Sequence, residues 1–523
     1  MHPEINSVIL LFLARAENTI PRFAFIQYFF TIHQTMYIQA PKLTVMKKFF
    51  LAGIAILMLA TTSRAQATDV ATDYLTPEFH KSRRDSARAK MPDNSVLVVF
   101  SYPTRTFSND VSYVYHANPD MYYFTGYKEP HGVLFIFKET QQSPGGAYNE
   151  LLFIQEKNAA AEQWTGRRIG TEGVKTALGF TNVFNGRDFK NHPQDFQKFN
   201  TVLLDRIPID VPDARGDTAD LYDLIRIFKE KSGLSIDKKF NYTAYRQLTG
   251  SLREIKTEEE MTLIRKAVEI SCIGQAEVMR AIHPKMSERE VQGLHEFVHK
   301  KYGAEHVGYP SIVGAGNNGC VLHYEENGKL NVGKDLLLMD VGAEYHGYTA
   351  DVTRTIPASG KFTPEQRAIY QVVYDAQEAC FAMLKEGVAW RDVNAKSREV
   401  IAAGLLRLGV VKKKEDANKY YPHGLGHHIG LDVHDRSASP VLKKNMVMTI
   451  EPGIYIPENS DCDKKWWGIA VRIEDDVLIR EKDYELLSTA APRKVEEIEK
   501  MIAEKSIFEN YTLPPLKAGK KAF

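Results

Sequence analysis

Two aspartates within one strand-turn-strand segment constrain the fold more than any other feature of this chain. The segment Leu336–Ile356, LLLMDVGAEYHGYTADVTRTI, has two β-rich runs around a glycine-containing centre and therefore predicts a hairpin. A turn centred on Tyr345 and His346 would set Asp340 opposite Asp351, about 5 Å apart on one face. Like charges in such a pair destabilise a sheet unless something positive lies between them. The alternative, favoured for an isolated pair of this spacing, is that one aspartate faces solvent in a turn.

Two glutamates also lie in apolar, strand-like runs. Glu451 belongs to TIEPGIYI and Glu474 belongs to AVRIEDDVLI. A buried carboxylate without a partner is costly, so strands of this kind usually conceal one. Simpler explanations are a salt bridge between Glu474 and Arg472, and a turn at the Pro-Gly pair that follows Glu451. Taken singly, each glutamate leaves both interpretations open.

The stretch HGLGHHIGLDVHD, residues 423–435, carries four histidines and three glycines. Gly424 and Gly426 would weaken a helix, which argues against a helical HxxxH zinc site. Four carboxylates and one imidazole around a point instead suit two divalent ions about 3.5 to 4 Å apart. Oxygen-rich ligation favours Mn²⁺, with Zn²⁺ or Co²⁺ as alternatives, over a thiolate-seeking ion. We therefore expect one histidine to bind metal and the others to contact a substrate.

Composition excludes several other classes of protein. The chain of 523 residues has 67 basic and 66 acidic side chains and no long run of one charge, so no nucleic-acid surface is indicated. Its four cysteines are far apart and form no CxxC, which argues against a zinc knuckle or a disulfide framework. No repeat or low-complexity stretch points to a structural role.

The N-terminal region contains a secretory signal pattern at Met46–Ala67, MKKFFLAGIAILMLATTSRAQA. Its apolar run, Phe49 to Ala60, is well short of the ~20 residues that a membrane-spanning helix needs, so we expect cleavage rather than a retained anchor. Small residues place the mature start near Gln66 or Thr68. Residues 1–45 precede this signal and are predicted to be a non-native upstream extension. The mature protein would then be periplasmic or secreted, without a stable membrane span.

Strand and helix patterns follow the signal. Apolar runs at Ser95–Phe100, Val133–Phe137 and Leu151–Ile154 predict buried strands, and Asp217–Lys231 has the spacing of an amphipathic helix. Together these elements predict an N-terminal α/β domain over residues 75–250.

A domain boundary is expected just before residues 257–260, which match a capping box, T-x-x-E, that opens a helix. The second domain is predicted to span residues 255–504. It combines strand-rich segments with helices at Pro364–Lys385 and Val393–Leu408. Residues 505–523 form a Pro- and Lys-rich tail that is expected to fray.

The motifs above resemble those of the pita-bread-fold metallopeptidases, a family that includes aminopeptidase P, prolidase and methionine aminopeptidase. Five motifs occur in the family's order: GCVLHYEEN, MDVGAEYHGYTADVTRT, HGLGHHIGLDVHD, TIEPGIYI and VRIEDD. The resemblance extends from about Leu75 to Ile502. It implies an α+β protein in which an N-terminal α/β domain precedes a pita-bread catalytic domain.

Within that family, the N-terminal half is similar to aminopeptidase P. The segments DMYYFTGYKEPHGVLFIF and QWTGRRIGTEGV, which start at Asp120 and Gln163, resemble its N-terminal domain. The resemblance implies a dinuclear metallo-aminopeptidase that releases the first residue from peptides with proline second, by a hydroxide shared between two metal ions. Prolidase, an Xaa-Pro dipeptidase, is the alternative, and an inactive binding protein on the same scaffold is a weaker one. We also expect a homo-oligomer, a dimer or a tetramer.

The resemblance further implies roles for ten residues. The metal ligands would be Asp340, Asp351, His427, Glu451 and Glu474. The catalytic residues would be His323, His434 and Glu451, and the substrate-binding residues would be His423, Tyr455 and Arg472. In this assignment Glu451 also accepts the water proton, while His323 and His434 donate hydrogen bonds to the substrate carbonyl oxygen. His428 is expected to be a packing or surface residue.

Overall fold

The structure of the protein is a computed structural model that describes residues 71, 73–143, 145–214, 219–233, 240–509 and 513–514. Residues Leu75–Phe523 form one compact unit. The predicted upstream extension, the signal peptide, its cleavage points and most of the predicted tail lie outside the described residues. Within the described residues, no helix is long and apolar enough to cross a membrane.

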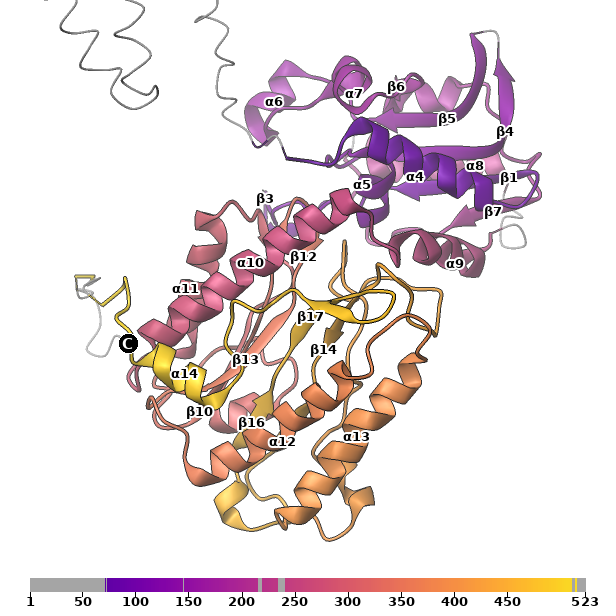
Figure 1. Cartoon of the computed structure of the whole chain (residues 1–523). Helices are drawn as coiled ribbons and strands as arrows, with labels where there is room; N and C mark the ends of the chain where they lie inside the picture. The colour runs from indigo at the N-terminus through magenta and orange to yellow at the C-terminus, as the bar shows by residue number, and fades with distance from the viewer. Residues whose placement is uncertain are drawn as a thin grey trace, which may run out of the picture. The chain divides into compact units, whose positions relative to one another are not determined.

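The N-terminal domain is built on a five-stranded mixed sheet with the strand order β6-β5-β4-β1-β7 (Figure 1). Its strands are β1 (Ser95–Phe100), β4 (Val133–Ser143), β5 (Gly146–Ile154), β6 (Val183–Asn185) and β7 (Thr201–Leu204). The predicted first strand coincides with β1, and the other two predicted strands lie within β4 and β5. All three sequence-predicted strands therefore belong to one sheet.

Alternate residues of this sheet enter two separate cores, because successive side chains of a strand point to opposite faces. Leu97 packs in the core that contains residues of helix α4 (Pro77–Lys90). Val98 packs in the core that contains residues of helix α8 (Leu221–Ser232). Burial of both faces explains why β1 is a continuous apolar run.

The remaining elements of this domain are short. They are β2 (Thr106–Ser108), β3 (Val111–Ser112), α5 (Pro119–Thr125), α6 (Ala159–Thr165), α7 (Gly170–Leu178), the 3₁₀ helix η1 (Gly186–Asn191) and α9 (Tyr242–Arg253). Helix α8 begins at Leu221 rather than at the predicted Asp217. The reason is that Asp220 is its N-cap and accepts a hydrogen bond from the Asp223 backbone N–H.

The C-terminal domain opens with helix α10 (Glu258–Ala281) at the predicted capping box. The Thr257 hydroxyl accepts a hydrogen bond from Glu260 N (3.3 Å), and the Glu260 carboxylate accepts one from Thr257 N (2.8 Å). The other helices are α11 (Glu288–Lys301), α12 (Pro364–Phe381), α13 (Trp390–Arg407) and α14 (Val495–Ile502). The helices predicted at Pro364–Lys385 and Val393–Leu408 correspond to α12 and α13, although α12 ends at Phe381 and α13 begins at Trp390. The boundary between the domains stays a prediction, because residues 75–523 form one compact unit.

Small antiparallel sheets make up the rest of this domain, with the strand orders β13-β10-β9, β12-β11-β8, β14-β17-β18 and β15-β16. The strands are β8 (His306–Val307), β9 (Ile312–Ala315), β10 (Leu336–Val341), β11 (Ala343–Tyr345), β12 (Tyr348–Thr349), β13 (Val352–Pro357), β14 (Val447–Ile450), β15 (Gly453–Ile456), β16 (Ile469–Arg472), β17 (Asp475–Ile479) and β18 (Tyr484–Leu486). Three 3₁₀ helices connect them: η3 (Gly316–Cys320), η4 (Lys414–Lys419) and η5 (Lys464–Trp466).

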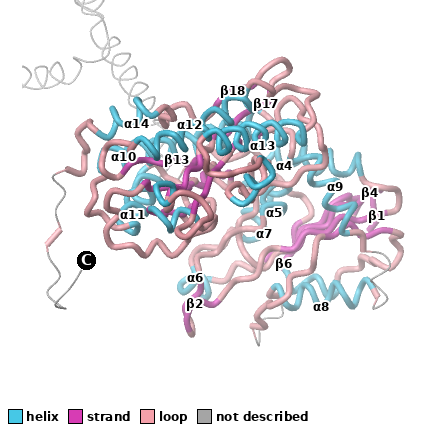
Figure 2. Tube along the Cα trace, turned by 90° about the horizontal axis from the view of Figure 1, so that it is seen from below, coloured by secondary structure: helices cyan, strands magenta, loops and turns pink. Residues whose placement is uncertain are grey.

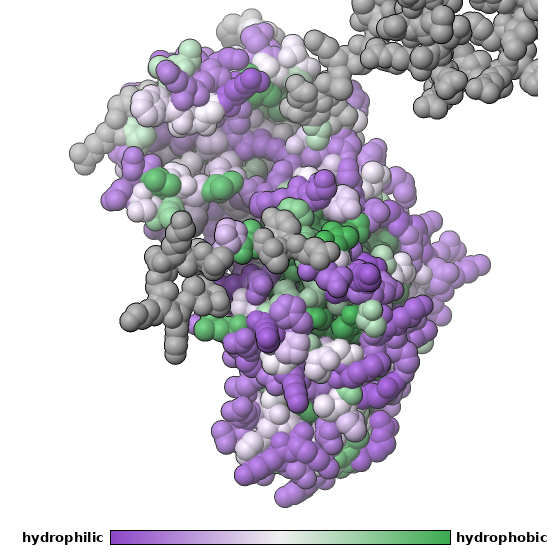
Figure 3. Space-filling view, turned by 90° about the vertical axis from the view of Figure 1, so that its left-hand side faces the viewer, coloured by the Kyte–Doolittle hydropathy of each residue, from purple (hydrophilic) through white to green (hydrophobic). Residues whose placement is uncertain are grey.

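Helices of the C-terminal domain cover these strands, as Figure 2 shows for α10, α12 and α13. One core joins apolar residues from both kinds of element, among them Val278 of α10, Leu337 of β10, Ile369 of α12, Ile401 of α13 and Ile454 of β15. On the face drawn in Figure 3, hydrophobic side chains gather near the middle of the described part, and hydrophilic ones cover its lower end.

The predicted hairpin Leu336–Ile356 is present, but its turn lies further along the chain than predicted. His346 and Gly347 are the central residues, with φ of 51° and 87°, and Tyr345 pairs with Tyr348. Two-residue turns of type I′ need positive φ at both central positions, and glycine adopts it without strain. The predicted centre at Tyr345 and His346 is therefore wrong.

This difference corrects the predicted pairing of the two aspartates. Asp340 lies opposite Thr353, not opposite Asp351. Because the register differs by two residues and side chains alternate with a period of two, both aspartates still belong to the same face. They are diagonal neighbours rather than a directly opposed pair.

Candidate active site

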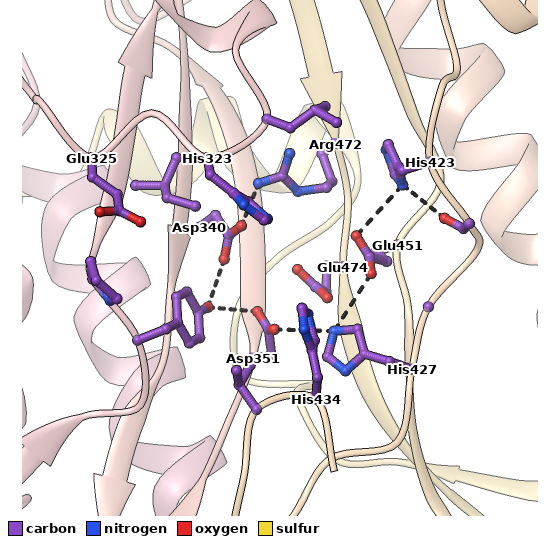
Figure 4. Close-up of a pocket in the computed structure, with 17 residues that line it drawn as sticks. His323, Glu325, Asp340, Asp351, His423, His427, His434, Glu451, Arg472 and Glu474 are labelled. Carbon is purple, nitrogen blue, oxygen red and sulfur yellow. Dashed lines mark hydrogen bonds and ion pairs between the residues drawn. The ribbon is translucent and has the colours of Figure 1, made fainter. Parts of the chain in front are cut away.

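A cavity of about 330 Å³ lies in the C-terminal domain, and Figure 4 shows the side chains that line it. Nine of the ten residues given a role by the resemblance line this cavity: His323, Asp340, Asp351, His423, His427, His434, Glu451, Arg472 and Glu474. The tenth, Tyr455, is hydrogen-bonded to two of them. Residues far apart in the sequence therefore converge on one place.

The four carboxylates come from two sheets that meet at the cavity. Asp340 belongs to β10, Asp351 precedes β13, Glu451 follows β14 and Glu474 precedes β17. The Glu474 backbone N–H donates a hydrogen bond to the Thr353 carbonyl oxygen (3.1 Å), which joins the β10–β13 pair to the segment that leads into β17. This junction sets the acids of one sheet against those of the other.

The hydroxyl of Tyr309 lies between the two aspartates. It is 2.6 Å from Asp340 Oδ1 and 2.5 Å from Asp351 Oδ1. A phenol carries one hydrogen and can donate to only one acceptor at a time. The phenol can therefore donate to only one of the two carboxylates, and the other contact needs either a proton on a carboxyl group or a cation between the acids.

His427 faces the acids from the glycine-rich stretch. Its Nε2 atom lies 3.5 Å from Asp351 Oδ2 and 3.6 Å from Glu451 Oε1. Asp351, His427 and Glu474 each offer one ligand atom, and these atoms all lie within 4.8 Å of one another. This is the spacing of groups that could share one metal ion.

Burial and mutual repulsion raise the pKa values of three of the acids. Burial raises the pKa of Glu451 to about 7. Burial first, and then the neighbouring carboxylates, raise the pKa values of Asp351 and Glu474 well above their usual range. Four carboxylates this close need a cation if all are to be ionised. Because Glu474 Oε1 is also buried without a hydrogen-bond partner among the described residues, the donor set fits divalent metal ions.

Arg472 connects the acids to Tyr455. Its guanidinium pairs with Asp340, donates to the Tyr455 hydroxyl (3.0 Å) and donates to Thr353 Oγ1 (3.2 Å). Thr353 Oγ1 in turn lies 2.6 Å from Glu474 Oε2. The simple explanation in which Arg472 pairs directly with Glu474 is therefore wrong, because Thr353 stands between them.

Three further histidines surround the acids. His423 Nε2 lies 2.8 Å from the Tyr455 hydroxyl, and burial together with the charge of Arg472 lowers the pKa of His423 to about 4. The His434 ring meets the His427 ring edge-on, with centroids 4.3 Å apart. His323 lines the opposite part of the cavity (Figure 4). These imidazoles are placed to contact a ligand held at the acids.

Comparison with known proteins agrees with both halves of the chain. Residues 262–481 match Metallopeptidase family M24, and residues 80–203 match the Aminopeptidase P, N-terminal domain. The Xaa-Pro aminopeptidase of Escherichia coli (strain K12) is 32% identical over 452 residues, which cover 81% of this chain and 97% of that protein.

The chain belongs to metallopeptidase family M24.

Other relatives of this M24 protein are similar over nearly the same length. Intermediate cleaving peptidase 55 of Schizosaccharomyces pombe is 31% identical and covers 86% of this chain and 94% of its own. The solved structure of E. coli aminopeptidase P with the inhibitor Pro-Leu is 30% identical, with a TM-score of 0.72 over 82% of this chain and 98% of that one. The predicted α+β fold, with an N-terminal α/β domain before a pita-bread domain, is confirmed.

Two of the residues that contact the aspartates of the M24 site were not predicted from the sequence. Tyr309 lies in the loop between β8 and β9, where no motif marks it. Asp476 is fully buried, and its Oδ2 accepts a hydrogen bond from Asp351 N (3.0 Å). Strand alternation was a usable signal for Asp476, because it lies two residues after Glu474 and so shares its face.

The structure also tests the prediction for His428. Its side chain is 9% exposed, and its backbone bridges to Met448. It does not line the cavity. His428 is therefore a packing residue, as predicted.

Proposed function

We propose that this M24 protein is a metal-dependent aminopeptidase that removes the first residue from peptides with proline at the second position. The observation that carries the proposal is the convergence of four carboxylates and His427 on a cavity that three further histidines also line. The E. coli relative named Xaa-Pro aminopeptidase, matched over 97% of its length, supports this substrate class. Prolidase-type cleavage of Xaa-Pro dipeptides is the less favoured alternative.

The acidic side of the cavity would hold the metal ions. When bound, two divalent ions would make a water-derived nucleophile available near neutral pH and polarise the scissile carbonyl. The proposed ligands are Asp340, Asp351, His427, Glu451 and Glu474. Glu451 also faces the cavity and would accept the proton that the attacking water loses. Arg472 would hold Asp340 in a fixed orientation.

The histidines would act on the substrate. His323 and His434 would donate hydrogen bonds to the carbonyl oxygen as negative charge develops on it, and preorganised donors of this kind contribute about 3 to 4 kcal/mol each. His423 is held by Tyr455 and would contact the bound peptide. A prolyl nitrogen has no N–H before cleavage, so the site must protonate the leaving nitrogen and accommodate the ring.

The ligand set supports Mn²⁺ as the working ion, because carboxylate oxygens outnumber the single imidazole nitrogen. Zn²⁺ and Co²⁺ are the alternatives. One solved relative is described as Zn substituted E. coli aminopeptidase P in complex with product, at 30% identity. The identity of the ion therefore needs a measurement on this chain.

Export and self-association are further parts of the proposal. The signal pattern at 46–67 supports a periplasmic or secreted protein. The surface around the β2–β3 hairpin supports a homo-oligomer, a dimer or a tetramer. Phe107 in β2 is 63% exposed, and Val114, which follows β3, is 81% exposed. Exposed apolar side chains grouped in this way are typical of protein interfaces.

A peptide panel tests the proposed function. Metal-loaded protein should release the first residue from an Xaa-Pro-Yaa tripeptide and from longer Xaa-Pro peptides. The matched comparisons are the Xaa-Pro dipeptide and an Xaa-Ala-Yaa tripeptide. Cleavage of the dipeptide alone would establish the prolidase alternative. Equal cleavage of the alanine and proline tripeptides would contradict proline specificity. This comparison is useful because one relative is named intermediate cleaving peptidase 55 and not Xaa-Pro aminopeptidase.

A further inference from the structure

The histidine stretch 423–435 contains two aspartates that the proposed reaction does not use. Asp432 and Asp435 flank His434 but do not line the cavity. Both pair with one guanidinium, because Arg253 Nη2 lies 2.7 Å from Asp432 Oδ2 and 2.6 Å from Asp435 Oδ1. Arg253 ends helix α9, and its side chain is 1% exposed. The loop that presents His434 is thus tied to the segment between the two domains.

The same guanidinium also reaches the N-terminal domain. Arg253 Nη1 lies 2.9 Å from Asp120 Oδ1, and Asp120 is 2% exposed in helix α5. Arg436, directly after the stretch, pairs with the other Asp120 oxygen at 2.8 Å. The Tyr245 hydroxyl donates to that oxygen at 2.7 Å. Asp120 therefore joins α5 of the N-terminal domain to both ends of the segment 432–436.

Close packing leaves little freedom in this arrangement. Lys256 Nζ lies 2.8 Å from Asp435 Oδ2, and both side chains are buried. A Cβ atom on Gly430 would come within 2.2 Å of Asp435 Oδ2 and 2.7 Å of Lys256 Nζ. The ion pair is therefore packed directly against the loop backbone. The Asp435 N–H also donates to His428 O (2.8 Å), which closes the loop on itself.

His434 depends on this backbone for its orientation. Its ring makes no hydrogen bond within the described part of the chain. It packs edge-on against the His427 ring. The two residues that flank it at positions 432 and 435 are fixed by ion pairs outside the cavity. Because a misplacement of about 1 Å can lower a rate about 10²-fold, holding these neighbours has a direct consequence for catalysis.

We propose that Arg253, Asp432, Asp435 and Asp120 form a positioning cluster that fixes the His434 imidazole, so that the N-terminal domain takes part in orienting the catalytic loop. A stabilising role alone is a weaker explanation, because apolar replacements of buried ion pairs are often neutral or stabilising. The inference rests on the role proposed above for His434. It adds a function for the two aspartates of the stretch and for the domain junction.

A double-mutant cycle between Asp432 and His434 tests the cluster. Arg253 is unsuitable as the first target, because its removal would leave Asp120 and Asp435 buried without a partner and could prevent folding. Asp432 is 40% exposed, so Asp432→Ala should fold. The matched control is Asp416→Ala, since Asp416 is also 40% exposed and paired, with Lys419 at 3.6 Å. The assay uses whichever peptide of the panel the wild type cleaves fastest.

The cycle separates positioning from a structural role. Asp432→Ala should lower kcat about 10-fold, with KM and Mn²⁺ affinity changed less than about 2-fold. In a His434→Ala background the same change should lower kcat by less than about 2-fold, because the positioned ring is already absent. Asp416→Ala should leave kcat unchanged in both backgrounds.

Three results would overturn the inference. An equal loss of kcat from Asp432→Ala in both backgrounds would mean that Asp432 does not act through His434. An unchanged kcat for Asp432→Ala would mean that the ion pair between Asp432 and Arg253 is not needed to position His434. Full activity of His434→Ala would mean that the His434 imidazole has no catalytic role that positioning could serve. Metal-dependent peptide cleavage by the wild type would still support the rest of the proposed function.

Discussion

Thr353 donates a 2.6 Å hydrogen bond from its hydroxyl to Glu474 Oε2, and this contact joins the two sheets that supply the acids of the candidate site. Thr353 is paired with Asp340 across the β10–β13 ladder. Glu474, a proposed metal ligand of one sheet, is thus oriented by a residue that also faces Asp340, a proposed ligand of the other sheet. Such supporting contacts are what hold metal-ligating carboxylates in position.

Replacing Thr353 by valine should weaken metal binding. The substitution keeps the shape of the side chain but removes the hydroxyl that orients Glu474, and loss of such a contact typically lowers metal affinity about 10-fold or more. Titration calorimetry with Mn²⁺ measures the change. The matched control is Thr125→Val, which removes a buried hydroxyl bonded to Met121 O in the N-terminal domain. Equal metal affinity in wild type and Thr353→Val would contradict the prediction.

Tyr309→Phe should destabilise the metal-free protein more than the metal-loaded protein. Without metal, the phenol is the donor between Asp340 and Asp351, and loss of a buried donor costs about 1 to 3 kcal/mol. With metal bound, the cation satisfies both acids. Calorimetric Tm values with and without Mn²⁺ should therefore show a larger metal-induced rise for the variant. The same rise in both proteins would refute the bridging role.

Chelation should abolish activity, and Mn²⁺ should restore it best. The four carboxylates and His427 form an oxygen-rich site, which favours a hard ion. Elemental analysis of the reloaded protein should give about two ions per chain, the number that this ligand set implies. Full activity in protein shown to be free of metal would overturn the mechanism. Better restoration by Zn²⁺ or Co²⁺ would change only the choice of ion.

His295 and His299 should make the protein less stable in acid. They lie four residues apart on α11 in an H-E-x-x-H pattern typical of zinc helices, yet both are buried. All four ring nitrogens lack a hydrogen-bond partner in the described part of the chain. Burial lowers the pKa of His299 to about 4 and that of His295 well below its usual value of 6.5.

The sign of the effect follows from proton uptake. Between pH 6.5 and 4 the unfolded chain binds a proton at His299 that the folded protein does not bind. The free energy of unfolding should therefore decrease as the pH is lowered from 6.5 to 4, by up to about 3 kcal/mol for this residue. Denaturant unfolding at several pH values measures it. His299→Gln should reduce the loss of unfolding free energy between pH 6.5 and 4, whereas His283→Gln, at an exposed position, should not. An unchanged pH dependence in His299→Gln would count against this explanation.

The purified native protein should begin near Gln66 or Thr68. The expectation follows from the small residues that end the signal pattern at 46–67. Intact-mass measurement of protein recovered from the periplasm or the medium decides it. Recovery of a chain that still starts at Met1 or Met46 would show that no cleavage occurs.

The sequence alone determined the fold class, the residues with proposed roles at the site and most of the elements. Acids such as Glu451 and Glu474 stand out because an apolar strand makes an unpaired carboxylate expensive, and this local rule needs no knowledge of the fold. The capping box at Thr257 and the buried strand β1 were likewise predictable, because each depends on residues only a few positions apart. Family motifs then extended these local signals to the histidines.

Only the tertiary structure decided which side chains meet. The turn at His346 and Gly347 placed Thr353, not Asp351, opposite Asp340, because glycine tolerates the positive φ that the turn requires. Tyr309 reaches the site from a loop whose local pattern carries no mark of a metal centre, and the hydrogen bond from Asp351 N to Asp476 depends on how the two sheets meet. Arg253 links Asp432 to the N-terminal domain across a long separation in sequence. Periodicity specifies the face of a strand, whereas partners across sheets and domains depend on how those faces pack together.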